Sequence, residues 1–237
     1  PRSTLFPYTT LFRSILCVAP TVNTEALSGI DDYFFRMSPS VRTSASVSAE
    51  YQIRSGDMTR VAVIYDVGNR AYTESWLDNF KELFVQNGGA IVSAISYNTQ
   101  ENTRFGEIAG EALSFDINGI LIIANSMDSA LLCQQIRKMN TTVKITLADW
   151  GCATEQLLEF GGKAVEGVTF PQIFDRESAA PAYRVFLNTY LKKIGREPGV
   201  PGMNGHHAAH VVLTALKAQK NGEDLKKNLL SIRRFEG

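Results

Sequence analysis

The chain has 237 residues, of which 44% are hydrophobic and 20% are charged. These proportions are typical of a soluble globular protein with one or two cores, and they exclude fibrous and disordered classes. Lysine plus arginine and aspartate plus glutamate each total 24, so no net field would draw the chain to nucleic acid or to an anionic membrane. We therefore expect a ligand that is small or net neutral.

The cysteines and the hydropathy exclude several further classes. Cys17, Cys133 and Cys152 lie far apart and form no C-x-x-C pair, which argues against a zinc site or a redox dithiol. The sequence leaves open whether two of the three cysteines form a disulfide. No run approaches the roughly 18 apolar residues of a membrane span, and no charged region followed by an apolar stretch marks a signal peptide. The hydropathy pattern therefore does not indicate the cellular compartment of the protein.

The first 14 residues, PRSTLFPYTTLFRS, show neither helical nor strand periodicity. Read back into codons, they resemble a translated sequencing adapter. We interpret residues 1–14 as a non-native tail and leave them out of the fold prediction; the alternative is a genuine mobile terminus.

From Ile15 onward, short apolar runs alternate with segments that have helical spacing. The strand candidates, in chain order, are residues 15–19, 60–65, 90–96, 119–124, 144–148 and 167–171. The clearest helix is 182–194, with an apolar stripe of Tyr183, Phe186, Leu187 and Tyr190. Gly88 and Gly195 are expected to end helices.

This alternation predicts an α/β fold with a doubly wound parallel sheet that is covered by helices on both faces. Ligands of such sheets bind beyond the carboxyl ends of the strands. Three loops there carry polar or aromatic residues directly after an apolar run: 66–73, 125–128 and 149–152. A small-molecule site is expected where they meet.

Several segments together resemble the branched-chain amino acid binding proteins, which are type I periplasmic binding proteins of ABC transporters. They are RVAVIYD at 60–66, NRAYTESW at 69–76, DDYFFR at 31–36 and GREP at 195–198. The resemblance covers residues 15–237 and implies two lobes. It implies that 41–172 form a complete C-terminal lobe and that 15–40 and 173–237 form a partial N-terminal lobe, with hinge crossings near Pro39 and Ile173.

The resemblance further implies a truncated family member, in which the stripe of helix 182–194 would be partly exposed. It implies an extracytoplasmic location, periplasmic or membrane-anchored, and capture of an amino acid or amide-like solute for a membrane permease. The full-length protein would be monomeric, with no nucleic-acid partner and no cofactor. The alternative is a ligand-sensing domain of a receptor or regulator with the same fold.

In such proteins the N-terminal lobe holds a ligand carboxylate with hydroxyl and backbone N–H groups. Thr21 and Asn23 fall at that loop, where a threonine is usual at the second position. The alternative is that residues 21–24 cap a helix.

The other lobe holds the ligand ammonium with an acidic or aromatic residue. Tyr72 and Asn125 fall where the family supplies tyrosines, and Asp149 and Trp150 fall at its ligand-facing acid. A structural aromatic and a helix N-cap are the plainer interpretations of Tyr72 and Asp149.

The sequence gives no clear motif for metal binding or catalysis. His206 and His210 could share a helical face as metal ligands do, but no third ligand has matching spacing, so we predict no metal. No Walker A motif, dinucleotide fingerprint or nucleophile elbow follows any strand. The sequence therefore predicts a binding protein rather than an enzyme.

Overall fold

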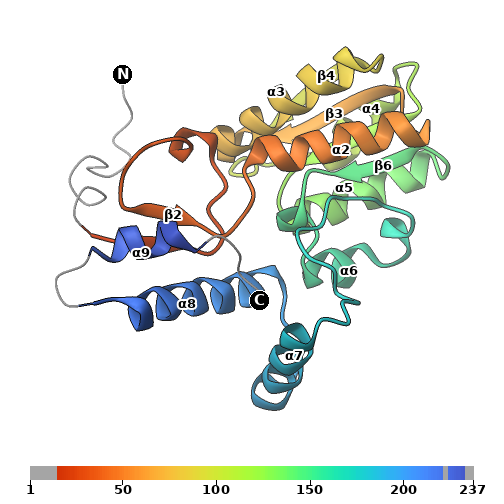
Figure 1. The fold of residues 1–237 in the computed structure, drawn as a ribbon. Coiled ribbons are helices and arrows are strands. Elements are labelled where there is room, and N and C mark those ends of the chain that lie inside the picture. Colours follow the sequence, from red (N-terminus) through yellow and green to blue (C-terminus); the bar gives the residue numbers. More distant parts are fainter. Residues whose placement is uncertain (1–14, 221–223, 233–237) are drawn as a thin grey trace. The chain divides into compact units, whose positions relative to one another are not determined.

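A computed structural model of the chain describes residues 15–220 and 224–232 (Figure 1). The adapter-like segment 1–14 lies outside the described residues. The contacts divide the chain into two compact units. The central unit is Ser40–Gln172, and the split unit comprises the described residues before Ser40 and after Gln172.

The central unit is built on one parallel sheet of four strands. They are β3 (Arg60–Asp66), β4 (Ala90–Tyr97), β5 (Gly119–Ile123) and β6 (Lys144–Leu147), in the order β4-β3-β5-β6. Every pairing is parallel, and β3 lies between β4 and β5. After β3 the chain adds β4 on one side of β3, and it then crosses over to add β5 on the other side. The direction in which strands are added therefore reverses between β3 and β5. The predicted doubly wound α/β sheet is confirmed.

Helices cover both faces of this sheet. They are α2 (Val41–Ser55), α3 (Arg70–Gln86), α4 (Phe105–Leu113), α5 (Ser126–Met139) and α6 (Glu155–Gly161). Helix α2 packs against α3, and α5 packs against both α4 and α6. Because α3 and α4 connect strands in opposite directions, right-handed crossovers place them on opposite faces. Both faces are therefore closed, as Figure 1 shows.

Sequence signals explain the helices on the first face. Ser40 caps α2 by accepting a hydrogen bond from the Thr43 N–H, and Gly56 ends it at φ 70°. On α3, Trp76, Phe80 and Phe84 are four residues apart and fully buried, with stacked rings. The helix thus lays one aromatic stripe on the sheet.

The glycine pair after α3 ends the helix as predicted. Gly88 has φ 90°, a conformation that favours glycine. At Gly89 an added Cβ would clash with the Phe84 ring, so only glycine fits there.

One predicted strand, residues 167–171, is wrong. The structure has a single bridge there, between Thr146 and Thr169. Gly167 has φ 74°, which breaks the extended conformation just before it. In addition, Pro171 offers no N–H for a ladder.

The split unit has little sheet. Strands β1 (Cys17–Ala19) and β2 (Phe34–Arg36) form one parallel pair, and only β1 was predicted. Three helices follow: α7 (Pro181–Ile194), α8 (Val200–Ala218) and α9 (Leu225–Ser231). Gly195 ends α7 at φ 80°, as expected. Short 3-10 helices complete the two units: η1 (Glu25–Leu27), η2 (Val67–Asn69), η3 (Trp150–Cys152) and η4 (Gly162–Val165).

Helix α7 buries part of its predicted apolar stripe. Tyr183 and Leu187 are buried, and they form a small cluster with Met203 of α8. Exposure falls instead on Val185, of which 68% is accessible, and on Ile194. Phe186 and Tyr190 are half-buried, so the predicted stripe is partly exposed, while α8 covers Tyr183 and Leu187.

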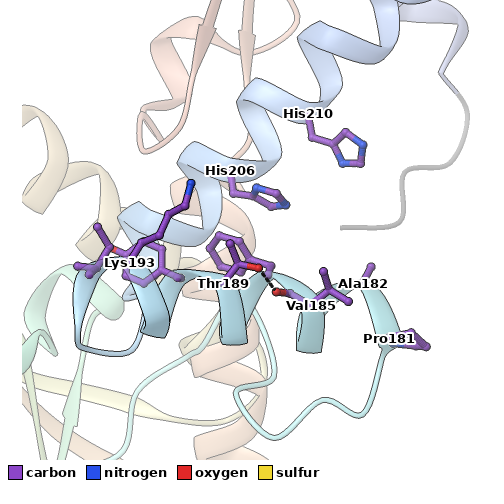
Figure 2. A pocket seen from close by; sticks show the side chains of 10 residues that line it. Pro181, Ala182, Val185, Thr189, Lys193, His206 and His210 are labelled. Atoms are coloured by element: carbon purple, nitrogen blue, oxygen red, sulfur yellow. Dashed lines mark hydrogen bonds between the residues drawn. The ribbon is translucent and has the colours of Figure 1, made fainter.

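A cavity of about 640 Å³ lies between α7 and α8 (Figure 2). Its lining is mostly apolar, with Lys193, His206 and His210 as its basic side chains. The His206 ring stacks on Phe186 with ring centroids 4.3 Å apart. Burial lowers the pKa of His206, and the neighbouring His210 lowers it further.

The described residues contain no group of three or more metal-ligating side chains. Cys17, Cys133 and Cys152 are free thiols, so none of them forms a disulfide. Among the helices that the structure describes, none combines the length and apolarity needed to cross a membrane.

Candidate functional site

The candidate site lies at the carboxyl edge of the central sheet. Strands β3, β5 and β6 all end at this edge, and the segments that follow them begin at Val67, Ala124 and Ala148. The strand order reverses between β3 and β5, and ligands of open α/β sheets bind at such a point. The three loops that the sequence singled out therefore lie beside the expected binding position.

Tyr72 and Asp149 meet at this edge, although 77 residues separate them. The Tyr72 hydroxyl donates a hydrogen bond of 2.6 Å to Oδ2 of Asp149. The Gly151 N–H donates a bond of 2.8 Å to Oδ1, so both carboxyl oxygens are engaged. Tyr72 is half-buried, and only 2% of Asp149 is exposed.

Burial dominates the electrostatics of this pair. It raises the pKa of Asp149, and the hydrogen bonds from Tyr72 and Gly151 oppose that increase. Burial also raises the pKa of Tyr72 well above its usual value. Cys152 beside them is fully buried, which raises its pKa to about 12. An added positive charge would stabilise the Asp149 carboxylate.

Asn125 begins the neighbouring helix. Its Oδ1 accepts a 2.9 Å hydrogen bond from the Asp128 N–H, which makes it the N-cap of α5. The residue is exposed. The side-chain oxygen is thus committed to the helix.

Ser126 ties this helix start to the loop that carries Asp149. Its hydroxyl donates to the Gly151 carbonyl at 3.0 Å and accepts from the Thr154 N–H at 3.1 Å. The loops after β5 and β6 are therefore bound to each other. Trp150 opens η3 in the second loop, and its side chain lies outside what the structure describes.

A second buried carboxylate, Asp128, was not predicted as a site residue. Its Oδ2 accepts hydrogen bonds from the Tyr97 hydroxyl at 2.9 Å and from the Thr99 hydroxyl at 2.8 Å. Burial, followed by the Asp128 charge, raises the pKa of Tyr97. This cluster joins the end of β4 to the start of α5.

Asp66 extends the same network. Its Oδ1 accepts from the Gly68 N–H at 2.8 Å and from the Thr99 N–H at 3.0 Å. Asp66 and Asp128 both lie within the loops that the sequence marked, and that was the available signal. The carboxyl edge thus holds three buried carboxylates, Asp66, Asp128 and Asp149.

Thr21 and Asn23 belong to the split unit, and each is half-buried. Hydrogen bonds hold both ends of their loop. The Pro20 carbonyl accepts from Asn204 and Ser38 at 2.9 Å each, and the Thr24 carbonyl accepts from Arg36 at 2.8 Å. The loop is therefore held in place within its own unit.

Comparison with known proteins shows the family to which the chain belongs. Residues 10–237 match the family described as periplasmic binding protein. The chain therefore belongs to the periplasmic binding protein family. No curated protein matches it.

Solved structures share the fold. A leucine-binding protein, LivK, from Thermotoga maritima is 24% identical, with a TM-score of 0.80 over 92% of this chain and 61% of its own. The branched-chain amino acid binding protein LivJ from Streptococcus pneumoniae, in complex with isoleucine, is 20% identical, with a TM-score of 0.80 over 94% and 63%. The present chain thus spans about three fifths of their length.

A third relative has a different ligand. The solute-binding protein of an ABC transporter from Rhodopseudomonas palustris, in complex with 3,4-dihydroxybenzoic acid, is 20% identical, with a TM-score of 0.75 over 92% of this chain and 59% of its own. The resemblance to branched-chain amino acid binding proteins is confirmed, whereas the fold alone leaves the ligand class undecided.

Proposed function

We propose that the chain is the solute-binding component of an ABC transporter and captures an amino acid or a similar small polar solute between two lobes. The main support is the hydrogen bond between Tyr72 and the buried Asp149 at the carboxyl edge of a parallel sheet. A carboxylate in this position supplies the anion that a ligand ammonium requires, and the ammonium in turn offsets the cost of burying the charge.

The lobes of the proposal follow the predicted boundaries. Residues 41–172 form the C-terminal lobe, and residues 15–40 and 173–237 belong to the N-terminal lobe. The separation of the contacts at Pro39/Ser40 and at Gln172/Ile173 supports this assignment. Closure about these two crossings would bury the solute, and burial would supply the affinity.

Each lobe has its own task in this proposal. Thr21 and Asn23 offer hydroxyl, amide and backbone groups to the ligand carboxylate. Asp149 holds the ammonium, and Tyr72 orients the Asp149 carboxyl group. Trp150 is the aromatic candidate for the ammonium that the resemblance implies. The capping bond of Asn125 leaves its amide nitrogen for the solute.

The buried acid favours amino acids over aromatic acids. Isoleucine and 3,4-dihydroxybenzoic acid, found in two of the similar structures, both carry a carboxyl group, but only isoleucine carries an ammonium. An aromatic acid would bring its negative charge toward the unneutralised Asp149. We therefore infer that the ligand is an amino acid or an amide-bearing solute with a cationic or donor group.

The partner of this function is a membrane permease, and the location is outside the cytoplasm, periplasmic or anchored to the membrane. Both follow from the family to which the chain belongs and from the ABC transporter proteins that share its fold. The protein would act as a monomer, without a cofactor and without catalysis.

Calorimetric titration tests the proposal. L-leucine, L-isoleucine and benzoate are titrated into the wild type, Asp149→Asn and the surface control Asp116→Asn. We expect Asp149→Asn to weaken amino acid binding by about 2 kcal/mol or more, roughly 30-fold, because an ammonium loses its buried partner. Asp116→Asn should change nothing, since the Asp116 side chain is 93% exposed. Equal affinity in both variants, or tighter binding of benzoate, would contradict the proposed role of Asp149.

A further inference from the structure

Two donors from different elements hold the Asp149 carboxyl group. Tyr72 of α3 donates to Oδ2 at 2.6 Å, and the Gly151 N–H of η3 donates to Oδ1 at 2.8 Å. Each carboxylate oxygen can accept two hydrogen bonds, so each keeps one acceptor position for a ligand. The direction in which these positions point therefore depends on where Tyr72 and Gly151 are fixed.

Gly151 lies very close to the carboxylate that it contacts. An added Cβ at Gly151 would lie 3.1 Å from Oδ1 of Asp149, so a larger residue would crowd the carboxyl group. Glycine, however, has more backbone freedom than any other residue, and it has no side chain to hold it in place. The N–H that reaches Asp149 therefore needs a second contact that fixes its residue.

Ser126 supplies that contact from the neighbouring helix. It is the first residue of α5 and is 4% exposed, and its hydroxyl donates to the Gly151 carbonyl at 3.0 Å. The same oxygen accepts from the N–H of Thr154 at 3.1 Å and from the Thr154 hydroxyl at 2.8 Å. With two bonds accepted and one donated, the Ser126 hydroxyl uses its full hydrogen-bonding capacity.

These three bonds divide into a tether and a positioning contact. Thr154 is the N-cap of α6, but its hydroxyl makes no capping bond to that helix and donates to Ser126 instead. Thr154 thus joins the start of α6 to the start of α5. The Ser126 proton is left for the Gly151 carbonyl, and this bond alone leads on to the solute site.

The electrostatics of Asp149 make the Gly151 bond important. Burial raises the pKa of Asp149, and the hydrogen bonds from Tyr72 and Gly151 oppose that increase. Cys152, the other titratable group beside the carboxylate, has a pKa raised to about 12 by burial and therefore stays neutral. Loss of the Gly151 bond would raise the pKa of Asp149 further, because the charged form would lose a donor.

We propose that Ser126 is a positioning residue of the solute site: it fixes Gly151, and Gly151 directs the Asp149 carboxylate toward the ligand ammonium. The inference rests on the proposed capture of an amino acid, although the link from Ser126 to Asp149 is present without a solute. Without the Ser126 hydroxyl, Gly151 is released. The carboxyl group is then held by Tyr72 alone and no longer points in one direction.

Carbon-13 NMR of the Asp149 carboxyl group in the solute-free full chain tests the link, and calorimetric titration of L-leucine tests its consequence. In Ser126→Ala, the pKa of Asp149 should rise and the Gly151 amide should exchange faster with solvent. L-leucine should bind about fivefold more weakly, the effect of one lost hydrogen bond. Ser126→Thr keeps the hydroxyl and should restore all three values.

Thr154→Val is the matched control. It removes one bond to the same hydroxyl but leaves the bond from Ser126 to Gly151 and the Thr154 N–H in place. It should therefore leave the pKa of Asp149 and the leucine affinity close to those of the wild type. If Ser126→Ala does not fold, Ser126→Cys replaces it: a thiol is a weak donor, so the pKa of Asp149 should still rise, but less.

Two results would overturn the inference. The first is a pKa of Asp149 and a Gly151 exchange rate that stay at their wild-type values when the Ser126 hydroxyl is removed. The second is an equal rise of that pKa in Ser126→Ala and Thr154→Val, which would make Ser126 a tether between helices and nothing more. If the wild type binds no amino acid, the proposed function is wrong, and the pKa comparison still decides whether Ser126 positions Asp149.

Discussion

The central and split units differ in how their apolar residues are covered. In the central unit, Trp76, Phe80 and Ile122 are fully buried in one continuous cluster between the sheet and its helices. In the split unit, a second cluster contains Tyr183, Leu187 and Met203, and the residues described there form a sheet of two short strands. The four-stranded sheet with helices on both faces buries a larger apolar cluster than the three helices and one strand pair described in the split unit.

The two units differ in their polar contacts as well. Asp66, Asp128 and Asp149 of the central unit are buried and hydrogen-bonded. In the split unit, Lys226 pairs with Asp31 at 2.6 Å, but the Asp31 side chain is 96% exposed. Exposed ion pairs add little stability, whereas buried networks hold loops in place. Stability and site geometry are thus concentrated in the central unit.

The largest predicted effect separates the two units by their unfolding. Both tryptophans, Trp76 and Trp150, belong to the central unit, so tryptophan fluorescence reports that unit alone. Circular dichroism reports the helices of both units. In urea, we expect the dichroism to fall before the fluorescence changes, because the split unit buries less. Coincident curves would contradict this difference.

Core variants sharpen this comparison. Phe80→Ala should reduce the free energy of unfolding of the central unit by about 3–5 kcal/mol, because it empties a fully buried site. Leu187→Ala should move only the earlier transition seen by dichroism. If Leu187→Ala shifted the fluorescence curve as well, the units would unfold together.

A smaller effect is expected at the buried carboxylate of α5. Asp128→Ala leaves the hydroxyl groups of Tyr97 and Thr99 without their acceptor. We expect a loss of about 1–3 kcal/mol in the fluorescence-monitored transition. Exposed Asp78→Ala on α3 is the control and should change stability by less than about 0.5 kcal/mol. Equal losses in the two variants would show that the Asp128 contacts are not significant.

The smallest predicted effect depends on pH and belongs to the split unit. Burial and His210 lower the pKa of His206, so the unfolded chain binds a proton more readily than the folded one. The stability from neutral His206 is complete above its unfolded pKa of 6.5 and is lost as the pH falls toward the folded value. The dichroism transition should therefore weaken between pH 7.5 and 5.5. His206→Phe keeps a ring against Phe186 and should reduce this dependence; an unchanged dependence would exclude His206 as its source.

The strands of the central unit were predictable because each is a continuous apolar run. Periodicity placed both ends of β3 to β6 within one residue. Strand β2 was missed because it has three residues and ends in Arg36. Residues 167–171 were predicted as a strand by composition, but Gly167 with its positive φ prevented a ladder.

The site was predictable as a set of loops but not as a set of contacts. The carboxyl-edge rule marked residues 66–73 and 149–152, which hold Tyr72, in the first turn of α3, and Asp149. It could not give their hydrogen bond, because the two residues meet only through the register of β3, β5 and β6. Asp128 was overlooked because an acid in the first turn of a helix is common and because Tyr97 lies 31 residues away.

A carbon-13 NMR titration of the Asp149 carboxyl group is the most direct test of the central claim. Burial should hold its pKa above the ordinary aspartate value in the chain without solute. Adding an amino acid ligand should lower that pKa, because the ammonium stabilises the carboxylate, while adding benzoate should not. A pKa of Asp149 that stays the same at saturating amino acid would contradict its proposed role as the partner of the ligand ammonium.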